Sequence, residues 1–285
     1  MKKIPVRQFK TSQQEPKLSE DFSIRDIRDL LTGKDMVQEL HRHDFFLILA
    51  LKKGAGSHEI DFESYNILDQ SVFFIRPGQV HQLTLKARST GFLVQFKYDF
   101  YSPRSNGSNV IMRKASNKNS WRLDATRYKK LHSILTYIFQ EYNDKQEGYQ
   151  EIIKANLDIF FTELTRQKSK TLAEKIDPYA QERLDELLEL IEAHVYSHKQ
   201  VSQFADMLNL SSYQLNAITK AMLNKTCSEL INEHIILESK RNLLATTNQV
   251  SQIAYQLGYE DVSYFIRFFK KHTGQSPDVF RRNFR

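Results

Sequence analysis

The sequence predicts a multidomain α+β protein, in which a β-rich N-terminal domain with two packing helices precedes an all-α C-terminal domain. Three observations support this prediction. The first hundred residues contain short apolar or alternating runs that are separated by turn signals. Between residues 127 and 167 the apolar residues recur at spacings of three and four, which is the period of an amphipathic helix. From Glu182 onward no run has the pattern of a strand.

The runs in the first hundred residues are rich in Phe, Ile and Val, and turn-forming residues lie between them. They are HDFFLILALKKG, HEIDFESYNIL, SVFFIRPG, HQLTL and GFLVQFKY, with turn signals in KKGAGS, LDQS, RPGQ and ARSTG. Closely spaced short strands of this kind are typical of a sandwich or a barrel. We therefore expect a barrel over about residues 20–100.

Two amphipathic helices are predicted after the barrel, within residues 124–168. The segment 127–142 places Leu131, Leu135 and Ile138 on one stripe, and the segment 149–167 repeats the pattern. These stripes need a partner surface, which is either the barrel or a second copy of the chain. We assign residues 1–169 to the first domain, 170–180 to a polar linker and 181–285 to the C-terminal domain.

The C-terminal domain contains the same plan twice. QVSQFADMLNLSSYQLNAITKAM (200–222) predicts a short helix, a turn at Asn209-Leu210 and a second helix with Ser211 as its N-cap. SQIAYQLGYEDVSYFIRFFKK (251–271) repeats this order, with Gly258 in the turn. Asn tolerates the left-handed backbone conformation that Gly supplies in the second copy. The sequence therefore predicts two helix-turn-helix units, joined by a connecting helix.

The last helix of the second unit has one apolar and one basic side. Phe265 and Phe269 face its own core, and the opposite side carries Ser263, Tyr264, Arg267 and Lys270. In a helix-turn-helix the second helix enters the major groove of DNA. Arginine suits bidentate contact with guanine, whereas Lys270 and Lys271 suit contact with phosphates. The plain alternative is a helical pair with a solvated basic face.

The charge of the chain favours a polyanionic partner. The net charge is +7 and the isoelectric point is about 9.2. From residue 240 to the end there are eight basic and three acidic residues, which gives 8 − 3 = +5 for this stretch. Non-specific coating of nucleic acid is one alternative, and it predicts strong salt dependence without site preference.

Residues 198–285 resemble the DNA-binding domain of the AraC-type transcriptional regulators. The resemblance is carried by IAYQLGYEDVSYFIRFFKKHTGQSPDVFRR (253–282), in particular by Gly258-Tyr259, Tyr264-Phe265, Arg267 and Ser276-Pro277. It implies that two recognition helices enter successive major-groove segments on one face of the DNA. It also implies a dimer, double-stranded DNA as the main partner, and RNA polymerase as a candidate protein partner.

The first unit departs from the family pattern. Asn209 and Asn224 replace glycines, and Ala217 and Thr219 stand where family members carry Arg-x-Phe. We expect the first recognition helix to read DNA less strongly than the second, or to read shape and thymine methyl groups. The candidate DNA-binding residues of both units are Ser212, Tyr213, Asn216, Lys220, Ser263, Tyr264, Arg267, Lys270 and Lys271.

Three histidines are placed as in the cupin barrel, where H-x-H opens one strand and P-G-x-x-H opens another. These are His41 and His43 in ELHRHDFFLIL and His81 in FFIRPGQVHQL. In metal cupins such histidines bind iron, manganese or nickel together with a glutamate. Among the four residues that follow His43 the only carboxylate is Asp44, which should point to the opposite face from His43. We therefore expect ordinary hydrogen bonds and predict neither a metal nor a cofactor.

The resemblance implies that this cupin-like β-barrel is a sensory domain. Ligand pockets are concave and mostly apolar with a few polar groups. The candidate effector-binding residues are His43, His81, Phe46, Tyr65, Phe92 and Phe96. The alternative is that these aromatic residues only fill the barrel.

The sequence thus predicts an effector-responsive, sequence-specific DNA-binding transcription regulator, and not an enzyme. The alternative is a metal-dependent cupin enzyme with an accessory DNA-binding domain. The apolar runs are too short to span a bilayer, and the N-terminus lacks the apolar region of a secretory signal. The lone Cys227 excludes an intramolecular disulfide. We expect a cytoplasmic protein without a membrane partner.

Overall fold

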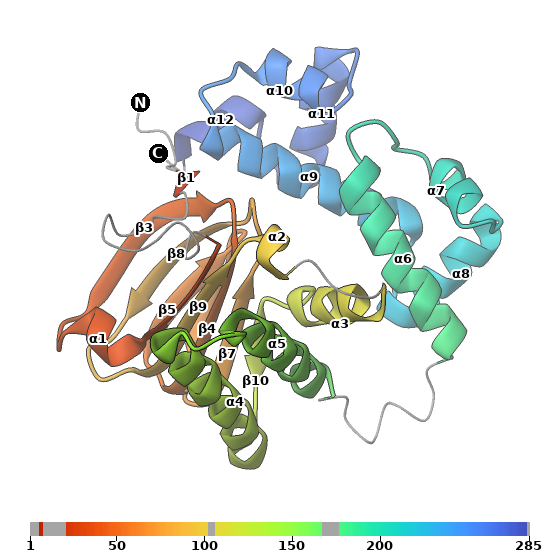
Figure 1. Cartoon of the computed structure of the whole chain (residues 1–285). Helices are drawn as coiled ribbons and strands as arrows, with labels where there is room; N and C mark the ends of the chain where they lie inside the picture. The colour runs from red at the N-terminus through yellow and green to blue at the C-terminus, as the bar shows by residue number, and fades with distance from the viewer. Residues whose placement is uncertain (1–5, 8–20, 102–105, 167–176, 284–285) are drawn as a thin grey trace. The chain divides into compact units, whose positions relative to one another are not determined.

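The computed structural model describes residues 6–7, 21–101, 106–166 and 177–283 (Figure 1). Among these, the residues up to 166 form one compact unit and those from 177 form a second. Residues 170–176 of the expected linker lie outside the described residues, and Pro178 already begins a helix. No helix of the described part of the chain is long and apolar enough to cross a membrane.

The N-terminal unit contains two five-stranded sheets, as the predicted barrel-like fold requires. One sheet has the order β1 (Val6–Arg7), β3 (Met36–His43), β8 (Val80–Leu85), β5 (Gly56–Ile60) and β6 (Glu63–Ile67). The other has the order β10 (Ser120–Arg122), β7 (Ser71–Ile75), β4 (Phe46–Lys53), β9 (Thr90–Phe96) and β2 (Phe22–Asp26). Apart from the parallel pair β1–β3, the neighbouring strands are antiparallel.

Strand β4 is buried on both faces, which explains why its sequence is a continuous apolar run. Leu47, Leu49 and Leu51 pack between the two sheets with side chains of β5, β7 and β8. Their neighbours Phe46, Ile48 and Ala50 point the other way, into a cluster shared with the helices that follow the barrel. The strand therefore belongs to two separate cores.

Helices α4 (Ala125–Asp144) and α5 (Tyr149–Thr165) cover the outer face of the β4 sheet. Asp124 caps the start of α4 by accepting a hydrogen bond from the Arg127 N–H. The ring of Phe161 on α5 stacks on Phe74 of β7, with centroids 5.6 Å apart. Figure 1 shows both helices beside this sheet. Their apolar stripes thus face the barrel, which is one of the two expected surfaces.

Three short helices of this unit had no clear signal in the sequence. They are α1 (Ile27–Leu31), α2 (Tyr98–Tyr101) and α3 (Asn106–Ser116). Helix α3 packs against α5. All three lie in stretches without a long apolar period, and contacts with the rest of the unit hold them in place.

The C-terminal unit is helical throughout its described residues. Helices α6 (Pro178–His194) and α9 (Cys227–Ala245) are the two long ones. The two predicted helix-turn-helix units are α7 (Val201–Met207) with α8 (Ser212–Leu223), and α10 (Val250–Gln256) with α11 (Val262–Thr273). Helix α9 connects them and buries apolar residues along its length, and α12 (Pro277–Asn283) packs against its far end.

The predicted turns of both units adopt left-handed backbone conformations. Asn209 has φ of 53° and Gly258 has φ of 75°. At Gly258 a Cβ atom would lie 2.0 Å from the carbonyl oxygen of Tyr196. The Nζ of Lys199 donates a hydrogen bond to the Gly258 carbonyl at 3.1 Å. Glycine is thus required both by the backbone angle and by the close approach of the segment that follows α6.

We expect Gly258→Ala to destabilise the C-terminal unit much more than the matched control Gly274→Ala. Gly274 has nearly the same φ, 77°, but no atom within 4 Å of its virtual Cβ. The left-handed conformation should cost about 1–2 kcal/mol in both variants. The clash at Gly258 should cost roughly a further 1–3 kcal/mol.

Urea unfolding of the full-length variants, followed by far-ultraviolet circular dichroism, measures this difference. Fluorescence of Trp121, the single tryptophan, reports the N-terminal unit and should not change. Equal destabilisation by the two substitutions would contradict the proposed packing role of Gly258.

Candidate DNA interface and a buried histidine cluster

Helices α8 and α11 begin at strong caps and have the same length. The Ser211 hydroxyl accepts a hydrogen bond from the Gln214 N–H at 3.2 Å. In turn, the side-chain oxygen of Gln214 accepts one from the Ser211 N–H at 2.9 Å. Asp261 caps α11 by accepting from the N–H groups of Ser263 and Tyr264. Each helix is twelve residues long and ends at a left-handed residue, Asn224 or Gly274 respectively.

The two helices bury equivalent positions. Leu215 and Thr219 of α8 are buried at the places that Phe265 and Phe269 occupy in α11. From the cap onward the sequence of exposed, half-buried and buried residues is the same in both helices over eleven positions, 211–221 and 261–271. They therefore present geometrically equivalent outer faces, which differ only in chemistry.

The outer face of α11 is basic and accessible. Its five predicted residues, Ser263, Tyr264, Arg267, Lys270 and Lys271, are all exposed. The Arg267 Nη2 lies 3.8 Å from Oδ2 of Asp261, and both side chains are more than 60% exposed, at 69% and 63%. An ion pair this long and this exposed contributes little. The guanidinium of Arg267 can therefore turn to another acceptor at small cost.

The outer face of α8 carries little charge. Tyr213 is 84% exposed. Lys220 is also exposed, as are Ala217 and Ala221, whereas Ser212 is half-buried. Ala217 and Ala221 occupy the positions of α8 that correspond to Arg267 and Lys271 in α11. This face can make apolar contacts through Tyr213 and the alanines, and one charged contact through Lys220.

Asn216 has a structural task within the domain. Its Oδ1 accepts a hydrogen bond from the Cys227 N–H at 3.0 Å, and its Nδ2 donates to the Ser212 carbonyl at 2.9 Å. Cys227 is the first residue of α9, so Asn216 satisfies one of the N–H groups that a helix start leaves without a partner. The sequence placed Asn216 towards bases, and the structure ties both ends of its amide to the backbone.

Several basic residues in the stretch from residue 240 to the end are buried or half-buried. Arg281, which is 8% exposed, donates to the carbonyls of Leu243 and Asn248 at 3.0 Å and 2.7 Å. Arg241 pairs with Glu238 one turn earlier on α9. Lys240 lies over the ring of Phe280, and burial lowers its pKa. The charge available to a partner is therefore concentrated on α11.

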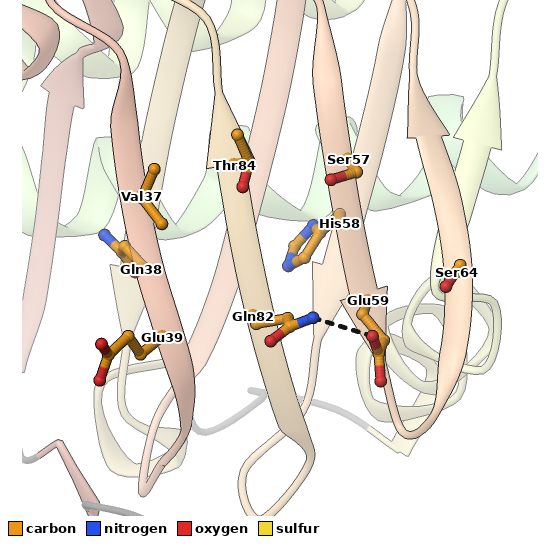
Figure 2. Close-up of a pocket in the computed structure, with 9 residues that line it drawn as sticks. All are labelled: Val37, Gln38, Glu39, Ser57, His58, Glu59, Ser64, Gln82 and Thr84. Carbon is orange, nitrogen blue, oxygen red and sulfur yellow. Dashed lines mark hydrogen bonds between the residues drawn. The ribbon is translucent and has the colours of Figure 1, made fainter. Parts of the chain in front are cut away.

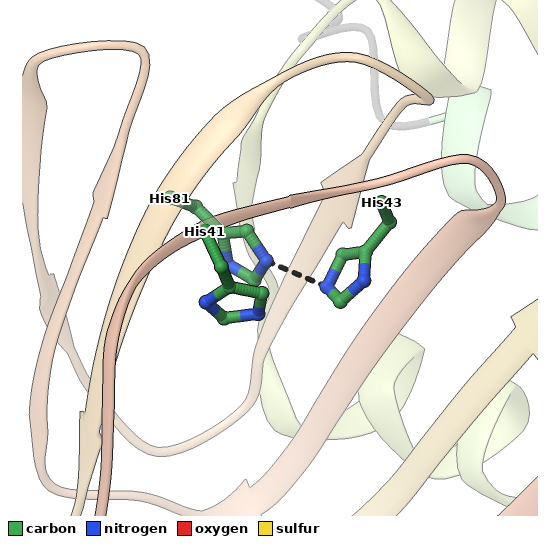
Figure 3. Close-up of side chains that lie close together, drawn as sticks. All are labelled: His41, His43 and His81. Carbon is green, nitrogen blue, oxygen red and sulfur yellow. Dashed lines mark hydrogen bonds between the residues drawn. The ribbon is translucent and has the colours of Figure 1, made fainter. Parts of the chain in front are cut away.

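The structure brings His41, His43 and His81 together between the sheets of the N-terminal unit. His41 and His43 alternate along β3 and point the same way, and His41 pairs directly with His81 of β8. All three are buried, and one nitrogen from each lies within 4.8 Å of the others (Figure 3). The Nε2 atoms of His43 and His81 are 2.8 Å apart. Asp44 is exposed and lies outside the cluster.

A fourth histidine, His58 of β5, extends this cluster and was missed in the sequence. Its Nε2 lies 2.9 Å from Nδ1 of His81. Burial, followed by the nearby His41, lowers the pKa of His58 to about 3, so its imidazole is neutral. The alternation of His58 with Ile60, both buried on the same face, was the available signal. Its proximity to His81 depends on the pairing of β5 with β8.

The candidate effector residues do not all lie together. His43 and His81 are between the sheets, whereas Phe46, Phe92 and Phe96 belong to the cluster that faces the helices. The alternation of side chains along a strand sets these faces apart. Tyr65 donates a hydrogen bond to Glu63 and packs near Phe73.

A polar pocket of about 340 Å³ is lined by residues of the neighbouring strands β3, β8, β5 and β6 (Figure 2). Gln82 donates a hydrogen bond to Glu59 at 2.9 Å within it. Carboxylate, amide and hydroxyl groups predominate, so a ligand here would be polar. The lining residues are Val37, Gln38, Glu39, Ser57, His58, Glu59, Ser64, Gln82 and Thr84.

Comparison with known protein families identifies both units. A family described as an AraC-like ligand binding domain matches residues 32–99, and a family described as a helix-turn-helix domain matches residues 204–283. The N-terminal unit thus matches the ligand binding domain of the AraC-type transcriptional regulators, and the C-terminal unit matches a helix-turn-helix domain. The resemblance found in residues 198–285 and the expected cupin-like fold are thereby confirmed.

Two relatives match most of the chain. The HTH-type transcriptional activator RhaS of Escherichia fergusonii is 23% identical over 249 residues, which are 85% of this chain and 87% of that protein. The RhaS protein of an Escherichia coli strain is 24% identical over 252 residues, with the same coverage.

Two solved structures are also similar. ToxT from Vibrio cholerae, bound to an unsaturated fatty acid, is 18% identical and covers 92% of this chain and 95% of its own, with a TM-score of 0.42. The C-terminal domain of the response regulator yesN from Fusobacterium nucleatum is 29% identical, and the match covers 35% of this chain and 98% of that domain, with a TM-score of 0.34.

We expect Asn216→Ala to destabilise the C-terminal unit by about 1 kcal/mol, as the loss of a helix cap does. Asn216→Asp should destabilise less than Asn216→Ala, because it loses the donor to the Ser212 carbonyl but keeps the acceptor for the Cys227 N–H and places a negative charge at a helix N-terminus. Urea unfolding followed by circular dichroism provides the measurement. If Asn216→Ala kept full stability but changed the preferred DNA sequence, Asn216 would be a base-reading residue instead.

Proposed function

We propose that this AraC-type regulator binds a specific DNA site by inserting α8 and α11 into successive segments of the major groove. The observation that carries the proposal is the equivalence of the two helices. They bury the same positions, end in the same way and leave corresponding faces exposed. A pair of recognition helices joined by one long helix suits a site of two boxes on one face of the duplex.

The chemistry of the two faces assigns different roles to them. On α11, Arg267 reads a guanine edge, and Lys270 and Lys271 bind phosphates. On α8, Tyr213 and the exposed alanines contact apolar groups such as thymine methyls, and Lys220 binds a phosphate. Helix α11 thus supplies most of the affinity, and α8 adds shape and methyl contacts.

The N-terminal domain responds to an effector and pairs two copies of the chain. An effector that binds one arrangement of the domains better than another shifts the population able to grip DNA. A symmetric dimer matches repeated half-sites, and RNA polymerase is the candidate partner at the promoter. The protein acts as a regulator, not an enzyme, in the cytoplasm where its DNA partner resides.

We expect Arg267→Ala to weaken the sequence preference at one of two boxes. Each good bidentate contact to a base is worth about 1–3 kcal/mol of discrimination, so the preferred base there should become degenerate. The measurement is selection of bound sequences from a random duplex pool, near physiological salt, with the wild type and the variant side by side. The wild type should enrich two short boxes about one helical turn apart.

Arg282→Ala is the matched control, because it removes the same charge from α12, outside both recognition helices. It should leave the selected motif unchanged. A motif altered equally by both substitutions would mean that Arg267 acts only through net charge. Enrichment of no motif by any of the proteins, with or without added effector candidates, would refute sequence-specific binding.

Lys270→Ala and Lys271→Ala should weaken binding to all DNA sequences about equally. Each lost phosphate contact should reduce the slope of log K against log salt by about one. The slope is measured by titrating the selected site and an unrelated duplex at several salt concentrations. An unchanged slope would show that these lysines point away from the DNA.

A further inference from the structure

We propose that Lys199, which precedes the first helix-turn-helix unit, is a positioning residue for α11, the recognition helix of the second unit. It holds the turn before α11 and so sets the direction in which Arg267 reaches a base. This inference rests on the DNA recognition proposed above. It names a residue outside both recognition helices on which the reading of one box depends.

The segment between α6 and α7 packs against the turn of the second unit, although about sixty residues separate them. The Nζ of Lys199 donates a hydrogen bond to the Gly258 carbonyl at 3.1 Å. The carbonyl oxygen of Tyr196 approaches the same turn so closely that a Cβ atom on Gly258 would lie 2.0 Å from it. The Tyr196 hydroxyl donates to Glu238 of α9 at 2.7 Å. The segment that holds the turn is therefore itself tied to the connecting helix.

The same ammonium group contacts the ring that supports the start of α11. The Nζ of Lys199 lies over the Tyr259 ring, 5.0 Å from its centroid, where a cation is attracted by the ring. The Tyr259 ring is buried and packs against Phe265 and Phe268, with centroids 5.3 Å and 5.8 Å away. The Tyr264 ring lies 6.0 Å away. Tyr259 thus connects Lys199 to the first two turns of α11.

Arg267 depends on this support because its own side chain is weakly held. Its contact with Asp261 is 3.8 Å long and exposed, so the backbone of α11 decides where the guanidinium starts from. Bidentate contact with guanine requires two N–H groups to be aligned with two acceptors. A small change in the direction of α11 would therefore weaken the reading of that base while the helix itself stays folded.

The first unit lacks a corresponding contact among the residues that the structure describes. Asn248 precedes the N-cap of α10 as Lys199 precedes the N-cap of α7. Its amide nitrogen donates to Gln256 at 3.3 Å and its carbonyl accepts from Arg281, so neither group reaches the turn at Asn209. The turn that Lys199 holds is the one before the helix with the arginine.

The test is the selection of bound duplexes by full-length Lys199→Met and Lys199→Arg, beside the wild type. Methionine keeps an unbranched apolar chain but removes the donor and the charge. The discrimination at the base read by Arg267 should fall roughly three- to tenfold, and the box of α8 should keep its preference. Lys199→Arg keeps a donor and a cation over the ring, and should regain most of the discrimination.

Lys240→Met is the matched control. Lys240 also lies over an aromatic ring, that of Phe280, but on α9 and away from the turn. The substitution removes the same charge and the same kind of contact, and should leave both boxes as in the wild type. Circular dichroism of each variant confirms folding before the selection.

A double-mutant cycle shows whether Lys199 acts through Arg267. In the Arg267→Ala background, Lys199→Met should change the discrimination at that base by less than about twofold, because the two residues serve one contact. Equal loss of affinity for all sequences, with both boxes intact, would make Lys199 a stabilising residue only. A salt slope reduced by about one, again with both boxes intact, would make it a phosphate contact. Either result would overturn the proposal.

Hydrogen exchange of the free protein gives a readout that needs no DNA. In Lys199→Met the amides of residues 258–265 should exchange about tenfold faster, because the turn loses a hydrogen bond and a ring contact, and those of α8 should not change. Unchanged exchange at the turn would overturn the proposal whatever the DNA result. Faster exchange, with no motif enriched by the wild type, would instead place the failure in sequence-specific binding.

Discussion

Helix α9 is held at both of its ends, and the spacing of the two recognition helices depends on that constraint. At its start the Asn216 side chain accepts from the Cys227 N–H. At its end Arg281 donates to the Leu243 carbonyl. The first bond comes from α8 and the second from α12, which packs on α11. Both units are therefore fastened to one helix, α8 through the Asn216 hydrogen bond and α11 through its packing on α9 and α12.

The same burial pattern on α8 and α11 leaves chemistry as the only difference between their outer faces. Arg267 and Lys271 in α11 correspond to Ala217 and Ala221 in α8. In α8, the Asn216 side chain is also hydrogen-bonded to the backbone within the domain.

In the N-terminal domain, the alternation of side chains along the strands separates two environments. Phe46, Phe92 and Phe96 join the helices on the outside of one sheet, and the histidines lie between the sheets. Buried imidazoles need polar partners, and here they find one another, His58 and a backbone carbonyl. These contacts restrain the orientation of the buried imidazoles.

The sequence by itself determined the features that depend on local backbone chemistry. The turns at Asn209 and Gly258, the cap at Ser211 and the apolar stripes of α4 and α5 follow from residue types and short spacings, and the structure confirms them. The tertiary structure alone decided which groups meet across long separations. It placed Asn216 against the start of α9 and His58 against His81, because strand register and helix packing depend on the whole chain.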